Sequence, residues 1–159
     1  MAQQIYMTLT GEKQGLISQR CGTYDSMGNK YQSLHRDEIF VLALSHSTHR
    51  DKNICHQPLS VTKIIDKSSP LSGIAISNNE KLQVNISFLR TDITGVNTKY
   101  YSMELRDAYL VDVSVNFPHS IDHNGAEAEE TLIFTFKSIT WRHHQAGTAG
   151  YSFWQDTVM

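Results

Sequence analysis

The chain has 159 residues, of which 40% are hydrophobic, so it can bury the core of one domain without disulfides or metals. Its net charge of −2 argues against a protein that neutralises nucleic-acid phosphates or anionic lipid. The N-terminus lacks a signal-peptide pattern, and no apolar run is long enough to span a membrane. These features predict a cytoplasmic protein that, if it leaves the cell, does so without a signal peptide.

The predicted elements begin with a short strand at residues 5–10, where apolar side chains alternate with others. Residues 11–30 are rich in Gly, Ser, Gln, Asn and Asp and predict a connection packed on the surface. Residues 39–44 (IFVLAL) form an unbroken apolar run. The run favours a strand covered on both faces, with a buried helical turn as the alternative. In an all-β protein, coverage of both faces usually requires a partner chain.

Residues 46–58 predict a polar loop that is long for a compact domain, which is typical of a functional or disordered segment. In the next predicted strand, at residues 59–66, Lys63 shares a face with apolar side chains. Residues 68–79 (SSPLSGIAISNN) contain the one helix signal, with Ser68 or Ser69 as the cap and an Asn pair at the end. A helix this short must pack on the sheet or close the end of a barrel.

Residues 82–88 alternate cleanly and predict another strand. The central element is residues 99–117, where eight of the nine odd positions from 101 onward are apolar or aromatic. This alternation predicts one long strand whose odd positions share the buried face. Asp107 is the exception in that row and predicts a bend or bulge at residues 107–108.

A polar hairpin tip at residues 118–130 leads into a return strand, where a bulge at residues 137–138 resets the alternation. Residues 151–154 form the last short segment. Six or seven strands and one short helix predict a single all-β domain over residues 1–159. The expected architecture is a compact β-barrel of two packed antiparallel sheets.

The densest group of possible metal ligands is His46, His49, Cys55 and His56. Zinc is bound by Cys and His side chains at short spacing, but this spacing matches no established ligand pattern. The polarity of the loop explains these residues without a metal, so no metal or cofactor is predicted. The chain has neither a nucleophile motif nor a glycine-rich phosphate loop, so no enzymatic activity is predicted. The two cysteines, Cys21 and Cys55, have no CxxC or framework spacing, which favours free thiols, with a disulfide as the alternative.

Several stretches, taken together, resemble the haemolysin-coregulated protein (Hcp) family, the tube proteins of bacterial type VI secretion systems. They are DEIFVLALS (37–45), IIDKSSPL (64–71), residues 100–110 and WRHHQAGTAGYSFW (141–154). The starting sequence IYMTLTGEKQG and the segment TKIIDKSSP are similar to the enterobacterial branch in particular. The resemblance covers essentially the whole chain in order. Its most specific parts are DKSSP before the helix and AGTAGYSFW near the end.

The resemblance implies a small β-barrel with one helix that forms hexameric rings, and these rings stack into a hollow tube. It also implies partners: effector proteins in the lumen, a valine–glycine-repeat spike protein at the tip, and a contractile sheath that ejects the tube. No catalytic residue is implied, and export would follow the type VI route. Because the chain ends just past the closing motif, a tube subunit without a C-terminal effector extension is expected.

The resemblance further implies that Ser45 faces the lumen and that the 46–58 loop reaches the adjacent ring. A ring closes when one interface between two unlike faces repeats, so candidate interface residues are sought on the apolar run, the loop and the last segment. These candidates are Ile39, Val41, Leu42, Leu44, His46, His49, Arg50, His56 and Trp154.

Two other hypotheses stay open. The first is a monomeric β-barrel that binds a small ligand such as a sugar, with Tyr24, Tyr31 and Trp154 as stacking surfaces. The second is a metal-dependent hydrolase that uses His46, His49 and His56. Light scattering, ligand-induced melting shifts and metal analysis distinguish these hypotheses from an assembly protein.

Overall fold

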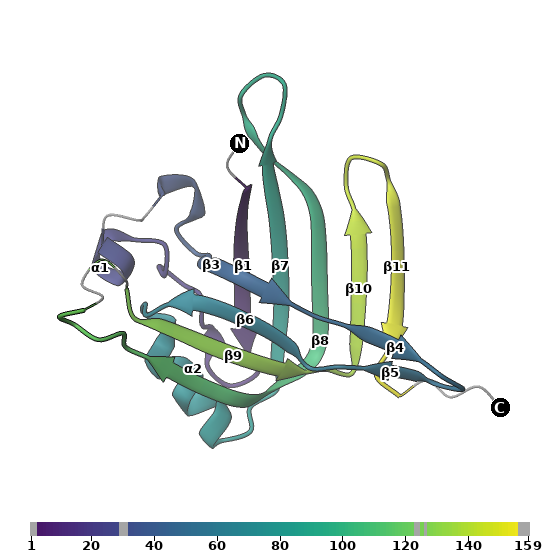
Figure 1. The fold of residues 1–159 in the computed structure, drawn as a ribbon. Coiled ribbons are helices and arrows are strands. Elements are labelled where there is room, and N and C mark those ends of the chain that lie inside the picture. The colour runs from purple at the N-terminus through teal and green to yellow at the C-terminus, as the bar shows by residue number, and fades with distance from the viewer. Residues whose placement is uncertain (1–2, 29–31, 123–124, 126, 156–159) are drawn as a thin grey trace.

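The computed structural model describes residues 3–28, 32–122, 125 and 127–155, and these residues are mostly β-strand (Figure 1). The predicted all-β class is confirmed. The strands are β1 (Gln3–Gly11), β2 (Gly15–Leu16), β3 (Ile39–Ser45), β4 (Thr48–Arg50), β5 (Ile54–His56), β6 (Leu59–Ile64), β7 (Leu82–Thr91), β8 (Asn97–Asn116), β9 (Glu129–Thr135), β10 (Ser138–His143) and β11 (Thr148–Phe153). The helices are α1 (Tyr24–Met27), the 3-10 turn η2 (Ser33–His35) and α2 (Ser68–Ser77). The prediction of one helix is therefore wrong, because the 11–30 segment contains the single turn α1.

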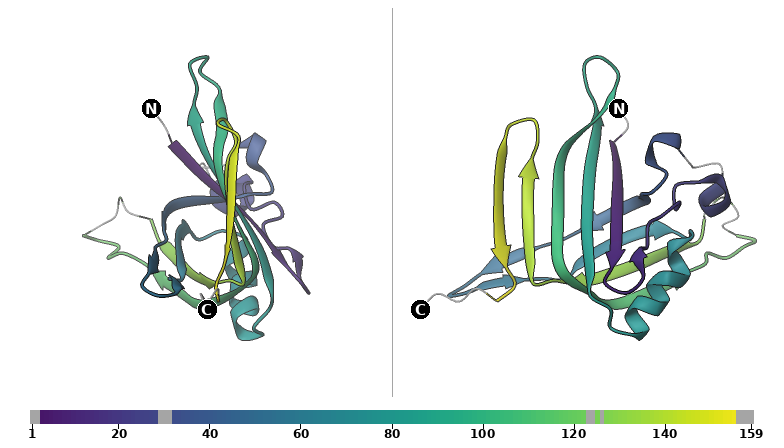
Figure 2. Two further views of the ribbon diagram at one scale, coloured as in Figure 1. Left: turned by 90° about the vertical axis from the view of Figure 1, so that its right-hand side faces the viewer. Right: turned by 180° about the vertical axis from the view of Figure 1, so that it is seen from behind.

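The main sheet folds back on itself. Its strand order is β11-β10-β8-β7-β1-β3-β6-β9, and β9 pairs again with β8. The pairings of β8, β7, β1, β3, β6 and β9 therefore form a closed circuit, while β10 and β11 extend from the first half of β8 (Figures 1 and 2). The two expected layers are thus parts of one continuous antiparallel sheet. A separate two-stranded sheet is formed by β4 and β5.

Strand β8 joins the two layers because it bends at Asp107. Asp107 has a φ of 49°, and the register with β7 shifts there: Leu82 pairs with Ala108, but Val84 pairs with Leu105. The extra residue on β8 is a β-bulge, which increases the local bend and twist. The bulge expected at residues 107–108 is confirmed. It lets the first half of β8 pair with β7 and β10 and the second half with β9.

The same bulge exchanges the two faces of the strand. Met103 and Leu105 are buried before it, whereas the even residues Ala108 and Leu110 are buried after it and Val111 is 51% exposed. The prediction that all odd positions share the buried face is therefore wrong beyond residue 107. Side chains alternate along a strand, so one inserted residue moves the side chains that directly follow it to the other face. A second register shift, against β9 between Leu110 and Asp112, reverses the faces again, and Val113 packs against the core.

The return segment is two strands rather than one strand with a bulge. β9 ends at residue 135 and β10 begins at residue 138, with buried Phe136 and exposed Lys137 between them. The Lys137 backbone N–H donates to the Arg106 carbonyl (3.0 Å), so the break lies beside the bend in β8. β9 follows the second half of β8, and β10 follows the first half.

Helix α2 packs against β8 and buries Ser72 and Ala75. Its first turn is capped by Asp66 rather than by Ser68 or Ser69, since Asp66 Oδ1 accepts from the Ser68 backbone N–H at 2.9 Å. The expected end at Asn78 is confirmed.

Among the described residues, no helix is both long and apolar enough to cross a membrane. The core between the layers contains Met7, Leu9, Ile39, Leu59, Ile86, Leu105, Leu132, Phe134 and Ile139.

A buried carboxylate fixes the turn between β1 and β2. Glu80 Oε2 accepts from the backbone N–H groups of Lys13 (3.0 Å) and Gln14 (2.9 Å), and Glu80 Oε1 accepts from Gln14 Nε2 (3.0 Å). Burial raises the pKa of Glu80, but the hydrogen bonds from Gln14 and Lys13 outweigh it and lower the pKa below its usual value. This carboxylate occupies the space beside Gly11, where a Cβ would lie 2.0 Å from Glu80 Oε2.

We expect Gly11→Ala to lower the free energy of unfolding by about 1–3 kcal/mol, because the new methyl group displaces a hydrogen-bonded carboxylate. Gly73→Ala is the matched control: Gly73 lies in α2, and its added Cβ would meet no atom within 4 Å. The control should gain about 0.5–1 kcal/mol from helix propensity. Urea denaturation measures both variants, and equal effects in the two would contradict the packing argument.

Candidate functional site

The segment expected as a polar loop at residues 46–58 is a β-hairpin, so that prediction is wrong. Strands β4 and β5 pair residue by residue, with Thr48 opposite His56, His49 opposite Cys55 and Arg50 opposite Ile54. We call residues 46–57 the arm. It extends from the end of β3 and passes beneath β10 and β11 in Figure 1. The polar side chains that suggested a loop are those of an exposed two-stranded element.

The base of the arm is joined to β11 by His56, whose side chain is almost entirely buried (4% exposed). His56 Nδ1 lies 3.2 Å from Thr48 Oγ1 on the arm, and His56 Nε2 lies 2.9 Å from Ser152 Oγ on β11. Both ring nitrogens of the imidazole therefore have a hydroxyl partner. Because Ser152 is 96 residues further along the chain, this contact could not be read from local sequence.

Aromatic rings surround this junction. His46 stacks on His56 with 6.0 Å between ring centroids, and both rings meet Phe136 edge-on at 5.7 and 5.4 Å. Trp154 lies 6.1 Å from His56 and 4.9 Å from Phe136, and its backbone N–H donates to the Lys137 carbonyl at 2.8 Å. Half-buried Trp154 thus packs on its own chain, and its predicted role at an interface stays a prediction.

Burial is the main influence on the pKa of both His46 and His56. It lowers the pKa of His46, helped by the neighbouring His56, and a hydrogen bond to the Gln57 backbone only partly opposes this. Burial also lowers the pKa of His56, and its hydrogen bond to the Phe153 backbone acts in the opposite direction. Both rings are therefore neutral at pH 7. Within the described part of the chain, His46 Nε2 is a buried nitrogen without a hydrogen-bond partner.

The possible zinc ligands are not brought together. Among the described residues, no three His, Cys, Asp or Glu side chains are placed to hold a metal ion. His46 and His56 lie at the base of the arm, whereas His49 and Cys55 are exposed further along it. Cys55 and buried Cys21 are both free thiols, and burial raises the pKa of Cys21 to about 12.

The apolar run on β3 is covered on one face only within the chain. Ile39 and Val41 point into the chain's own core, whereas Leu42 is 40% exposed and Ala43 is also exposed. A register shift against β6 between Val41 and Ala43 accounts for two successive exposed positions. Of the predicted interface residues on this strand, Leu42 and half-buried Leu44 remain accessible. Exposed Ser45 ends the strand, and exposed His49 and Arg50 lie on the arm.

A second exposed apolar surface was missed by the sequence prediction, because the alternation placed it in the core. It consists of Val111, Val115 (60% exposed) and Phe117 (72% exposed), on and just after the second half of β8. The signal that could have found exposed Val111 is Asp107, since a bulge there reverses the faces of the residues that directly follow it.

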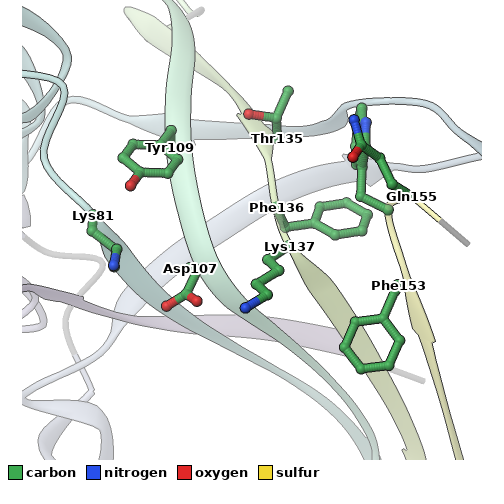
Figure 3. A pocket seen from close by; sticks show the side chains of 9 residues that line it. Lys81, Asp107, Tyr109, Thr135, Phe136, Lys137, Phe153 and Gln155 are labelled. Carbon is green, nitrogen blue, oxygen red and sulfur yellow. The ribbon is translucent and has the colours of Figure 1, made fainter.

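A cleft of about 710 Å³ opens at the bend in β8 (Figure 3). Figure 3 shows the Asp107 and Lys137 side chains turned toward the same part of it. The lining residues are Lys81, Asp107, Tyr109, Thr135, Phe136, Lys137, Phe153, Trp154 and Gln155. The aromatic group expected for sugar binding is not assembled around it. Tyr24 lies on α1, at the opposite end of the fold from β11 (Figure 1), and Tyr31 is outside the described residues.

Comparison with known proteins agrees with this fold. The family model described as "Type VI secretion system effector, Hcp" matches residues 6–143. A Pseudomonas aeruginosa protein named "Major exported protein" is 36% identical over 170 residues, which span 99% of both chains.

Two solved structures are similar over nearly their whole length. The one described as "Crystal structure of Hcp protein" has a TM-score of 0.91 and 27% identity, covering 98% of this chain and 99% of the other. "Secreted protein Hcp3 from Pseudomonas aeruginosa" has a TM-score of 0.88 and 36% identity, covering 98% of this chain and 100% of the other. The chain therefore belongs to the Hcp family of type VI secretion system proteins.

Proposed function

We propose that this chain is a structural tube subunit whose hexameric rings stack into a hollow tube that carries effector proteins. The tube is ejected by a contractile sheath with a valine–glycine-repeat spike protein at its tip, and export needs no signal peptide. The similar "Major exported protein" of Pseudomonas aeruginosa supports export. The function is carried by surfaces that join copies of the chain, so it requires no catalytic residue and no cofactor.

The observation that carries ring closure is a layer of four strands with two unlike edges. Strands β3, β6, β9 and the second half of β8 pair in that order. Among the described residues, β3 pairs with β1 only through residues 39–41, so residues 42–45 pair on one side. Residues 109–116 of β8 likewise pair only with β9. The layer therefore ends in a β3 edge and a β8 edge.

Unpaired strand edges bind other strands, and exposed apolar surface is typical of an interface. The β3 edge carries exposed Leu42, and the β8 edge carries exposed Val111 and Val115. The two edges lie on opposite sides of the layer, as its strand order requires. When the β3 edge of one copy joins the β8 edge of the next, the same unlike contact repeats from copy to copy, and it closes a ring of six where each copy is rotated by a sixth of a turn.

This arrangement gives roles to two groups of predicted residues. Ser45, at the end of the β3 edge, would lie in the continuous wall that faces the lumen. His49 and Arg50, exposed on the arm, would contact the adjacent ring. The near-neutral net charge of −2 allows many copies to stack without strong mutual repulsion.

Multi-angle light scattering of the purified chain is expected to give about six times the 18.0 kDa chain mass, and negative-stain images should show six-fold rings. A closed ring has no free edge, so the mass should stay constant over a wide concentration range above the assembly threshold. Particles that remain single chains at every concentration would overturn the proposal.

A further inference from the structure

The arm is a short two-stranded element. Each of its strands has three residues, and an isolated two-stranded hairpin of this size is at best marginally stable in water. At its base, the Gln57 backbone N–H donates to the Ser47 carbonyl (3.0 Å), which closes the hairpin on itself. The His56 side chain joins the arm to β11 through Ser152 and packs against Trp154.

We propose that His46 and His56 form a proton-operated latch: while both are neutral they hold the arm against β11, and protonation releases it. The assignment of ring stacking to the arm rests on the proposed function, whereas the latch itself is a property of the single chain. The latch is inferred from the stacking of His46 on His56, from the aromatic side chains around them and from the hydroxyl partners of His56.

The two rings differ in how they tolerate a proton. Protonated His56 could donate both N–H groups, because the Thr48 and Ser152 hydroxyl oxygens can each accept. Protonated His46 would place a charged N–H at Nε2, which is buried and without an acceptor among the described residues. An unpaired buried charge is strongly unfavourable. With ring centroids 6.0 Å apart, a charge on one histidine also disfavours a charge on the other.

Among the described residues, no carboxylate forms an ion pair with His46 or His56 at the base of the arm. The arm carries exposed His49, Arg50, Asp51 and Lys52, with Asp51 and Lys52 at the far tip. The adjoining elements contribute exposed Lys137 before β10 and Arg142 and His143 on β10. One carboxylate, Asp107 at the bend in β8, lines the neighbouring cleft together with Lys137, Phe136 and Trp154. Strands β3 and β11 carry no charged residue. None of these neighbours is paired with His46 or His56 to compensate a proton there.

The direction of the pH dependence follows. Burial lowers the pKa of both histidines below their ordinary value of 6.5, so the released arm binds protons more readily than the latched arm. The latch has its full strength above about pH 6.5 and weakens as the pH falls from there through the lowered pKa values. Deprotonation reverses the release.

The latch is tested by tryptophan fluorescence, because Trp141 and Trp154 lie 6.4 and 6.1 Å from His56. From about pH 7.5 to about pH 5 the natural sequence should show a reversible red shift and quenching of the emission. His46→Gln should move this transition to lower pH, because it removes the ring whose protonated form lacks an acceptor and leaves His56, whose two N–H groups keep hydroxyl acceptors, to release the arm alone. His49→Gln, on the exposed part of the same arm, is the control and should titrate like the natural sequence.

Two outcomes would overturn the latch: an emission constant over this pH range, or an identical transition in His46→Gln. Circular dichroism at pH 7.5 checks that the variant folds, and NMR titration of the imidazole signals in the natural sequence gives a second measurement that needs no variant. Imidazole titration at the ordinary value for both rings would also overturn it.

The same titration on single chains separates the latch from the proposed function. If single chains show the transition but the natural sequence never forms rings, the latch stands and the proposed function fails. If rings form and stack equally at pH 7.5 and pH 5 while the fluorescence stays constant, the latch fails and the proposed function stands.

Discussion

Replacing Lys63 with methionine is expected to lower the free energy of unfolding by about 3–5 kcal/mol. The Lys63 side chain is fully buried, and Nζ lies 3.0 Å from Asp66 Oδ1 and 2.9 Å from Glu130 Oε1. It also donates to the Ile64 carbonyl at 3.1 Å and to Ser69 Oγ at 3.2 Å. Methionine fills a similar volume but leaves two buried carboxylates without a cation, and removal of one partner from a buried ion cluster is strongly destabilising.

Lys67→Met is the matched control, since Lys67 is exposed at the start of α2 and its substitution should change the free energy by less than about 0.5 kcal/mol. A second test combines Lys63→Met with Asp66→Asn and Glu130→Gln, which should recover much of the loss because no buried charge remains. Urea denaturation measures all three. A loss below about 1 kcal/mol for Lys63→Met would contradict the role of the ion cluster.

The sequence could predict that Lys63 points inward, because it shares a strand face with apolar residues. It could not predict the partners. Glu130 lies on β9, 67 residues further along the chain, and reaches Lys63 because β6 and β9 pair. The same limit applies to His56, which was expected on a polar loop and instead contacts Ser152 on β11. The local sequence pattern shows which side chains turn inward, whereas the pairing of distant strands determines which residues these side chains contact.

Local signals predicted most of the longer strands, the helix expected within residues 68–79 and the bend at Asp107, but not the strands β4 and β5 of the arm or the break between β9 and β10. Periodicity failed where an inserted residue changes which positions of a strand face the core. After the Asp107 bulge the even residues Ala108 and Leu110 turn inward, which leaves Val111 on the surface, and a second register shift beyond Leu110 turns Val113 back toward the core. The exposed β8 edge was therefore hidden by an alternation that continued in the sequence but not in the structure.

Leu42→Asp is expected to convert rings into single chains of 18.0 kDa. Leu42 is exposed on the β3 edge, where the proposed contact would bury it against the β8 edge of the next copy. An unpaired carboxylate buried at each contact should weaken it by about 3 kcal/mol or more, which is at least about 100-fold in affinity. Ile93→Asp is the control, because Ile93 is fully exposed in the β7–β8 turn, away from both edges. Light scattering of Leu42→Asp that still shows rings would contradict the β3 edge as an interface.

Mixing two single-chain variants tests whether the interface joins unlike edges. Val111→Asp damages the β8 edge and leaves the β3 edge intact, whereas Leu42→Asp does the reverse. Each variant alone should remain a single chain. A one-to-one mixture should form pairs of about twice 18.0 kDa and nothing larger, since one intact β3 edge meets one intact β8 edge and both outer edges are damaged. If like edges joined instead, each variant alone would pair through its intact edge. The mass of each variant before mixing therefore decides between the two geometries.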